Sequence, residues 1–313
     1  DSSWLDRHGL QATNLTDLAG DVSVRRYLRA ELVSDSVVVA VYPSEIRSTC
    51  HRFLETSSLL TEAGVRVPEV IAHDCEQGLM VIEDVGQRTL YELAELDGRK
   101  LAAYFYQAVS HLAAIQGLPC ERVAKLNPPL DSALLSRELT QTWDSLLRPR
   151  GIVATDSFSS ELRACFEEMC RLLGEESPVP CHRDYMVRNL IPVEPHPCLA
   201  VIDHQDLRLG PEHYDLASVL NDSLFPSPQI EQEILDLHLG DALEDRLRYH
   251  RAAAQRTLKA VGTYETFALR GVERHRKLIA PTLSRALGHI SRLPEAARVS
   301  EELGARLRAT SIC

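Results

Sequence analysis

The spacing of apolar residues changes once along the chain, and this change most restricts the possible folds. Before about residue 88, apolar residues alternate or form short β-branched runs, which is typical of strands. From about residue 89 onward they recur every three or four residues, which is typical of helices. The sequence therefore predicts an α+β, bilobal fold with a small β-rich N-lobe, residues 1–85, and a larger helical C-lobe, residues 86–313.

The predicted N-lobe contains several strands and one helix. Residues 24–32 alternate and residues 37–42 form a β-branched run, which together predict a hairpin. Residues 50–64 carry apolar side chains on a helical period and end at a glycine. Apolar runs at 67–71 and 78–84 predict the rest of the sheet. We expect a small sheet with one helix packed on it.

The predicted C-lobe consists of helices on both sides of a polar loop. Helices are expected at 90–96, 100–116, 131–147, 159–173, 216–222, 230–239, 244–264 and 274–287. Pro281 should kink or break the last of these, because proline removes a helical hydrogen bond. A cleft between the two lobes is the expected ligand site.

The loop between these helices carries the most specific motif of the chain. Residues 181–189 read Cys-His-Arg-Asp-Tyr-Met-Val-Arg-Asn, and Asp203 follows a short hydrophobic run. Protein-kinase-like enzymes use an Asp to accept the hydroxyl proton of the acceptor, and an Asn with a second Asp to bind Mg²⁺. A His-x-Asp sequence alone is weak, but the later Asn and Asp make the pattern specific. We therefore expect ATP and Mg²⁺, with Asp184 as base and Asn189 and Asp203 as metal ligands.

The expected nucleotide site lies at the start and the end of the N-lobe. Residues 20–23 precede the first strand, where a loop ending at Ser23 would cover phosphates, although an ordinary turn fits equally well. Glu83 and Val85 would form the hinge, with backbone groups meeting an adenine edge.

Tyr42 stands where the kinase pattern places a phosphate-binding lysine, and no lysine precedes Lys100. A permanently charged arginine would be the substitute. The available arginines are Arg25, Arg26, Arg47 and Arg52, although each alone is more often a surface charge. We assign the role to Arg25.

Further polar residues near the motif are candidates for the acceptor site. Arg183, Arg188 and Arg208 would bind an acceptor carboxylate or the transferring phosphate, and Asp206 would assist. Salt bridges to Asp206 or Glu212 are the plainer alternative for these arginines. We expect Asp215 to brace the catalytic loop.

Composition excludes other classes of function. A formal net charge of −11 argues against a nucleic-acid partner, because such proteins carry basic patches. Apolar runs are too short to span a bilayer and no signal-sequence pattern is present, so we expect no membrane association and a cytoplasmic location. The 8 cysteines form no C-x-x-C pair, and we expect reduced, mostly structural thiols.

These motifs resemble the aminoglycoside phosphotransferase family, which has a protein-kinase-like fold. The likeness rests on the 182–189 run, on Asp203-His204-Gln205-Asp206 and on Gly210-Pro211 with 214–218. Within that family the chain looks most like the cell-wall-recycling kinases of N-acetylmuramate and N-acetylglucosamine, and residues 126–135 and 255–262 add to the likeness.

The resemblance implies a small-molecule kinase that uses ATP and Mg²⁺ and phosphorylates the anomeric hydroxyl of an amino sugar. It assigns the base to Asp184 and the metal ligands to Asn189 and Asp203. The subgroup typically has Phe where this chain has His204, and it tends to lack the N-lobe lysine. The alternatives are an aminoglycoside or choline-like amino-alcohol kinase, and a nucleotide-binding pseudokinase.

Overall fold

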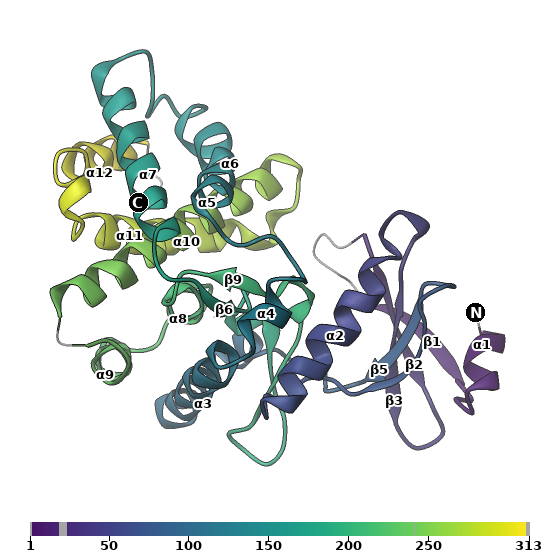
Figure 1. Cartoon of the computed structure of the whole chain (residues 1–313). Coiled ribbons are helices and arrows are strands. Elements are labelled where there is room, and N and C mark those ends of the chain that lie inside the picture. Colours follow the sequence, from purple (N-terminus) through teal and green to yellow (C-terminus); the bar gives the residue numbers. More distant parts are fainter. Residues whose placement is uncertain (1, 19–23, 241, 311–313) are drawn as a thin grey trace.

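The computed structural model describes residues 2–18, 24–240 and 242–310. A five-stranded antiparallel sheet lies at one end of the molecule, and helices fill the other end (Figure 1). Its strands follow the order β1-β2-β3-β5-β4 and are β1 (Asn14–Leu18), β2 (Arg26–Glu31), β3 (Ser36–Val41), β4 (Val70–Asp74) and β5 (Leu79–Glu83). The α+β prediction is confirmed. The division at residues 85 and 86 stays a prediction.

The two faces of the sheet bury different side chains. Val37 and Val39 of β3 pack with Trp4 of helix α1 (Ser2–Arg7) on one face. Ala40 packs on the other face with Phe53 of helix α2 (Thr49–Glu62). This alternation arises because successive strand side chains point to opposite faces. The β2–β3 hairpin is confirmed, whereas β1 was not predicted, because its residues are mostly exposed and give no apolar signal.

Helix α2 (Thr49–Glu62) confirms the predicted N-lobe helix and lies between the sheet and the helical end (Figure 1). Cys50 at its start forms a disulfide with Cys75 in the turn between β4 and β5. The expectation of reduced thiols was therefore wrong for these two residues. They are 25 residues apart, and only the packing of α2 on the sheet brings their Cα atoms to 5.6 Å.

The helical part begins after β5 and is interrupted by the motif loop. Before the loop lie η2 (Leu90–Leu93), α3 (Gly98–Gln116), α4 (Cys120–Val123), α5 (Ser132–Glu138), α6 (Thr140–Thr142), η3 (Trp143–Leu147) and α7 (Ser157–Gly174). After it lie α8 (Tyr214–Asn221), α9 (Pro228–His238), α10 (Leu243–Leu269), η6 (Glu273–Leu278), α11 (Ile279–Ile290), η7 (Pro294–Ala296) and α12 (Ser300–Ala309).

The predicted helix at 274–287 is broken, as expected from its proline, but the break precedes Pro281. η6 ends at Leu278, and Pro281 is the third residue of α11. Proline is tolerated there because the first N–H groups of a helix have no intrahelical partner. Among the described residues, no helix is both long enough and apolar enough to cross a membrane.

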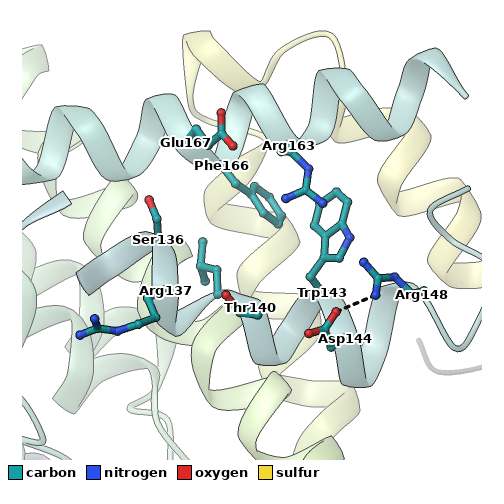
Figure 2. A pocket seen from close by; sticks show the side chains of 10 residues that line it. Ser136, Arg137, Thr140, Trp143, Asp144, Arg148, Arg163, Phe166 and Glu167 are labelled. Atoms are coloured by element: carbon teal, nitrogen blue, oxygen red, sulfur yellow. Dashed lines mark ion pairs between the residues drawn. The ribbon is translucent and has the colours of Figure 1, made fainter. Parts of the chain in front are cut away.

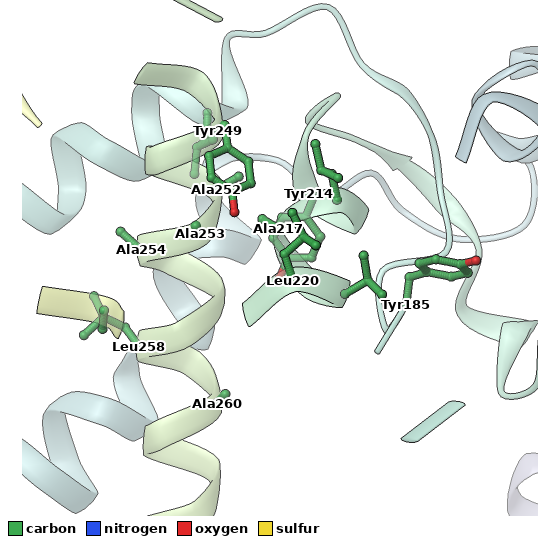
Figure 3. Packing of buried hydrophobic residues seen from close by; sticks show 14 of the residues in the cluster. Tyr185, Tyr214, Ala217, Leu220, Tyr249, Ala252, Ala253, Ala254, Leu258 and Ala260 are labelled. Carbon is green, nitrogen blue, oxygen red and sulfur yellow. The ribbon is translucent and has the colours of Figure 1, made fainter. Parts of the chain in front are cut away.

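Helix α10 forms the centre of the helical core. Ala252, Ala253 and Ala254 on α10 are fully buried, as are Tyr214 and Ala217 of α8. Figure 3 shows Ala252 on the side of α10 that faces Tyr214 and Ala217, whereas Ala254 points away from α8. The small side chain of Ala252 lets the two helices pack closely, so the position of α10 beside the motif loop is well determined.

Two short antiparallel strand pairs hold the motif loop. β6 (Val179–Cys181) pairs with β9 (Arg208–Gly210), and β7 (Leu190–Pro192) pairs with β8 (Leu199–Val201). Single 3₁₀ turns lie beside them at η4 (Val187–Asn189) and η5 (His204–Asp206). The sequence predicts a loop for this whole region, because strands of three residues carry too little periodicity to detect.

Candidate active site

The β7–β8 pair brings the two predicted metal ligands together. Asn189 directly precedes β7, and Asp203 lies two residues after β8. Leu190 is paired with Val201, and the Ile202 N–H donates to the Asn189 carbonyl at 3.0 Å. Residues 14 positions apart in the sequence therefore lie at the same end of one hairpin.

The side-chain oxygens at this end suit a hard cation. Asn189 Nδ2 donates to the Asp184 carbonyl at 2.8 Å, which leaves its amide oxygen as the atom that would bind metal. Asp203 accepts from Gln205 Nε2 at 2.7 Å, and its carboxylate is about half exposed. One amide and one carboxylate, completed by phosphate and water oxygens, match the preference of Mg²⁺. The residues thus fit the ion that the motif implies.

Backbone strain also marks this site. Arg183 and Asp203, with φ angles of 75° and 60°, are the only non-glycine residues with positive φ in the part of the chain that the structure describes. Such conformations cost about 1 kcal/mol each and cluster at functional sites.

Asp215 holds the strained loop in place. Its carboxylate accepts the backbone N–H of His182 at 2.6 Å and that of Arg183 at 2.9 Å. Burial raises the pKa of Asp215 to about 6, although His182 and these N–H groups oppose the rise. The predicted bracing role of Asp215 is confirmed by these contacts.

Two buried histidines connect the loop to its surroundings. His182 Nε2 lies 3.1 Å from the Ile202 carbonyl, which ties the two halves of the motif together. His204 Nδ1 lies 2.8 Å from Thr56 Oγ1 of α2, and its ring packs against Phe53. Burial lowers the pKa of His204 to about 3, so this ring is neutral and acts as a packing group. Helix α2 is thereby attached to the segment that carries the predicted metal ligand.

Three cations surround the predicted base. Asp184 Oδ1 lies 3.3 Å from Arg256 and 3.8 Å from Lys259 Nζ, and Oδ2 lies 3.5 Å from Arg183. Burial alone would raise the pKa of Asp184, but Lys259, Arg256 and Arg183 outweigh it and hold the pKa well below its ordinary value. Asp184 is therefore ionised at neutral pH.

Two of the cations beside Asp184, Arg256 and Lys259, are not predicted from the sequence. Both lie on α10, three residues apart and hence on one helix face, and they belong to the 255–262 segment quoted above. Two cations at helical spacing were the available signal. Their proximity to Asp184 becomes apparent only when α10 packs against the loop.

Glu138 of α5 was missed as well. It accepts from Arg183 at 2.7 Å, from Lys259 at 3.1 Å and from Gln255 at 3.3 Å. Burial would raise the pKa of Glu138, but Lys259 and Arg183 hold it below the ordinary value. A single acid in a predicted helix gave no sign of this role.

On the side of the sheet, Arg25 reaches the motif. Its guanidinium lies 3.5 Å from Asp203 Oδ1, 5.5 Å from the centroid of the Tyr27 ring and 5.7 Å from that of Tyr42. Tyr42 is 1% exposed and fills the position expected for a lysine with an aromatic ring. Ser23 and the rest of the expected phosphate loop, residues 20–23, lie outside the described residues.

The predicted hinge follows directly from β5. The Glu83 carboxylate binds Arg66, and the Glu83 backbone N–H donates to the Glu69 carbonyl at 2.8 Å. Asp84 binds Arg29 at 2.5 Å. Val85 is the first residue beyond these fixed groups, so its backbone is the better candidate for an adenine contact. That role stays a prediction.

The four predicted acceptor-site residues fall into two groups. Asp206 forms ion pairs with both Arg183 and Arg208, so the alternative of structural salt bridges is present for these residues. Arg188 lies apart from them and binds Asp222 at 3.3 Å. Their predicted part in acceptor binding is not tested by these contacts.

A separate hollow of about 510 Å³ lies between α7 and the α5–η3 segment (Figure 2). Figure 2 shows Trp143 and Phe166 on its wall, with the Arg163 guanidinium over the Trp143 ring at 4.2 Å. None of the motif residues lines it. We do not assign it to the active site.

The profile of the Phosphotransferase enzyme family matches residues 14–255, which is most of the chain and includes the whole motif. The chain belongs to this phosphotransferase family. The match confirms the predicted family and the prediction that the protein is a phosphotransferase.

Named relatives of this phosphotransferase are kinases. An N-acetylmuramate/N-acetylglucosamine kinase of Pseudomonas aeruginosa is 32% identical over 276 residues, covering 85% of this chain and 75% of that protein. A protein of the same name from Neisseria meningitidis is 29% identical, covering 85% of this chain and 76% of that protein.

Solved structures confirm the protein-kinase-like fold. Choline kinase LicA from Streptococcus pneumoniae superposes with a TM-score of 0.61 at 16% identity, covering 97% of both chains. The ADP-bound aminoglycoside phosphotransferase APH(2'')-Ib gives a TM-score of 0.60 at 15% identity, covering 94% of this chain and 97% of that one.

Proposed function

We propose that this phosphotransferase transfers the γ-phosphoryl group of ATP to the anomeric hydroxyl of an amino sugar, N-acetylmuramate or N-acetylglucosamine. The observation that carries the proposal is the convergence of Asp184, Asn189 and Asp203 at one end of the β7–β8 pair. The names of the relatives at 32% and 29% identity support the amino-sugar acceptor.

Asp184 would receive the acceptor hydroxyl. The hydroxyl proton passes to a carboxylate oxygen of Asp184, the acceptor oxygen bonds to the γ-phosphorus, and the bond to the β,γ-bridging oxygen breaks so that its electron pair leaves with ADP. The low pKa of Asp184 makes it a weak base, so this transfer is best late, when the acceptor oxygen is already bonding to phosphorus. An anomeric hydroxyl is more acidic than an ordinary alcohol and suits such a base.

Asn189 and Asp203 would hold Mg²⁺, which when bound neutralises charge on the nucleotide phosphates. Arg25, at 3.5 Å from Asp203, would supply the N-lobe cation in place of the absent lysine. The backbone at Glu83 and Val85 would meet the adenine, and residues 1–85 would thus form the nucleotide-binding lobe.

The acceptor would lie beside Asp184 on the C-lobe, within residues 86–313. Arg183 and Arg208 both bind Asp206, so we assign the three residues to shaping this site. Arg188, whose side chain is 20% exposed, is our candidate for an acceptor carboxylate.

ADP release measured with several acceptors tests the proposal. We expect turnover of N-acetylglucosamine and N-acetylmuramate, and none of their 1-O-methyl glycosides, in which the anomeric hydroxyl is blocked. Asp184→Asn should lower kcat by about 10³-fold, because the amide accepts no proton. Asp236→Asn, an exposed aspartate on α9, is the matched control and should keep wild-type turnover.

The outcomes separate the alternatives. Turnover of kanamycin or choline in preference to the sugars would replace the amino-sugar assignment, and phosphorylation of the methyl glycosides would exclude the anomeric position. Full activity of Asp184→Asn would remove Asp184 from its role. Nucleotide binding without turnover of any acceptor would indicate a pseudokinase, for which Tyr42 in the lysine position is the motivating observation.

A further inference from the structure

Lys259 is a mostly buried lysine that the proposed roles leave unexplained. Its side chain is 13% exposed, and Nζ lies 3.1 Å from Glu138 Oε1 and 3.8 Å from Asp184 Oδ1. It is carried by α10, whose close packing against α8 determines its position. A flexible surface lysine would have no such fixed relation to Asp184.

The ion pairs around Asp184 contain more cations than anions. Within the described chain they form one connected network of four cations and three carboxylates, which are Arg183, Arg208, Arg256 and Lys259 with Glu138, Asp184 and Asp206. The Asp215 carboxylate accepts the Arg183 N–H and is a fourth negative charge near Asp184, so the charges of the whole group balance. The cations nevertheless place several donors around one carboxylate, where the oxygens of a phosphoryl group would find them already in position.

Glu138 has partners besides Lys259. Arg183 already binds Glu138 at 2.7 Å, and Gln255 donates to its other oxygen at 3.3 Å. Of the four cations, Arg183 and Arg208 are engaged by Asp206, and Arg256 is further held by Ser218. Lys259, a compact charge with three rotatable donors, is the cation best able to accept another partner.

From this geometry we propose that Lys259 is a catalytic residue that binds the γ-phosphoryl group while it is transferred. This assignment rests on the proposed function, because it needs a nucleotide with its γ-phosphorus beside Asp184. As Asp184 takes up the acceptor proton it loses its charge, and the Lys259 ammonium then faces the phosphoryl oxygens with less competition. Lys259 would thus add a C-lobe cation to the N-lobe cation proposed at Arg25.

Nucleotide affinity tests the assignment without an acceptor. Lys259→Gln keeps a hydrogen-bond donor for Glu138 but removes the charge. Calorimetric Kd values are measured for ADP and for adenylyl imidodiphosphate, an ATP analogue that retains a γ-phosphoryl group, both with Mg²⁺. We expect the analogue to bind about tenfold more weakly to the variant, with ADP affinity unchanged, and kcat to fall about 100-fold. Lys259→Arg should recover most of both losses.

Two controls keep the result interpretable. Lys125→Gln replaces an exposed lysine and should leave both affinities unchanged. If Lys259→Gln does not fold, as judged by thermal unfolding, the double variant Glu138→Gln, Lys259→Gln removes both charges of the pair together and is measured instead.

Equal weakening of ADP and the analogue would overturn the assignment, because it would indicate a structural role. An unchanged analogue affinity, or an effect only on the KM of a carboxylate-bearing sugar, would also overturn it. Binding of neither nucleotide by the wild type would instead refute the proposed function itself, and this outcome is recognised before any variant is compared.

Discussion

Asp184 combines burial with three nearby cations, and this pairing defines the chemistry available to it. A carboxylate with a strongly lowered pKa keeps its charge at neutral pH but attracts a proton weakly. Such a group is better at orienting a hydroxyl than at deprotonating it in advance. The residues around it therefore matter as much as Asp184 itself.

Asp215 offers a test of this positioning at the level of one residue. Asp215→Asn replaces one of the two oxygens that accept the His182 and Arg183 N–H groups with an amide, which cannot accept. We expect kcat to fall by about 10- to 100-fold, with a smaller change in KM, because the loop is displaced while the binding groups remain. Steady-state kinetics on the folded variant would measure this. A change in KM alone would contradict the bracing role.

At the scale of elements, α10 serves both the core and the site. Ala252 lies on the same face as Arg256 and Lys259, and on this face Arg256 binds Ser218 of α8 while both cations reach Asp184. Gly262 lies where α10 crosses α6, and a Cβ there would meet the Thr142 backbone nitrogen at 2.5 Å. The close approach of these two helices explains why glycine occupies a helix interior that otherwise disfavours it.

Gly262→Ala should destabilise the protein by about 1–3 kcal/mol, because the added methyl group clashes with backbone that cannot move easily. Urea unfolding would give the difference in the free energy of unfolding. Gly98→Ala is the matched control, since a Cβ at the start of α3 meets nothing within 4 Å, and it should be neutral within about 0.5 kcal/mol. Equal effects of the two substitutions would show that helix packing at Gly262 is not limiting.

At the scale of the whole molecule, the sheet and the helical part meet at the motif. Arg25 of the sheet region contacts Asp203, and Thr56 of α2 contacts His204. Elsewhere α10 and α11 are joined by a partly buried pair, with His250 Nδ1 at 3.0 Å from His289 Nδ1. Burial, assisted by Arg292 and Arg246, lowers the pKa of His250 to about 4.

This histidine pair predicts a loss of stability in acid. Because the folded pKa of His250 lies below the unfolded value of about 6.5, the unfolded chain takes up more protons between about pH 6.5 and 4, and stability falls over that range. Between pH 7.5 and 5.0 we expect His250→Gln to lose about 1 kcal/mol less than the wild type, allowing for screening at this partly exposed ring. His51→Gln, at an exposed site on α2, should behave like the wild type. Parallel urea unfolding at both pH values would measure these losses, and equal losses in all three proteins would contradict the prediction.

The α+β order and most helices follow from the sequence alone, and so do the three motif residues as candidates. Apolar periodicity is a local property, so helices such as α3 and α7 were predicted within a few residues. Asp184, Asn189 and Asp203 could be proposed because they lie at a characteristic spacing within one short segment.

The distant residues that surround Asp184 are brought there by the packing of the helices. Glu138, Arg256 and Lys259 come from two helices far from the motif in sequence, and a charged residue in a predicted helix normally indicates a solvated face. The Cys50–Cys75 bond was misjudged for the same reason. Long-range contacts depend on how elements pack, and neither residue spacing nor composition along one chain encodes that packing locally.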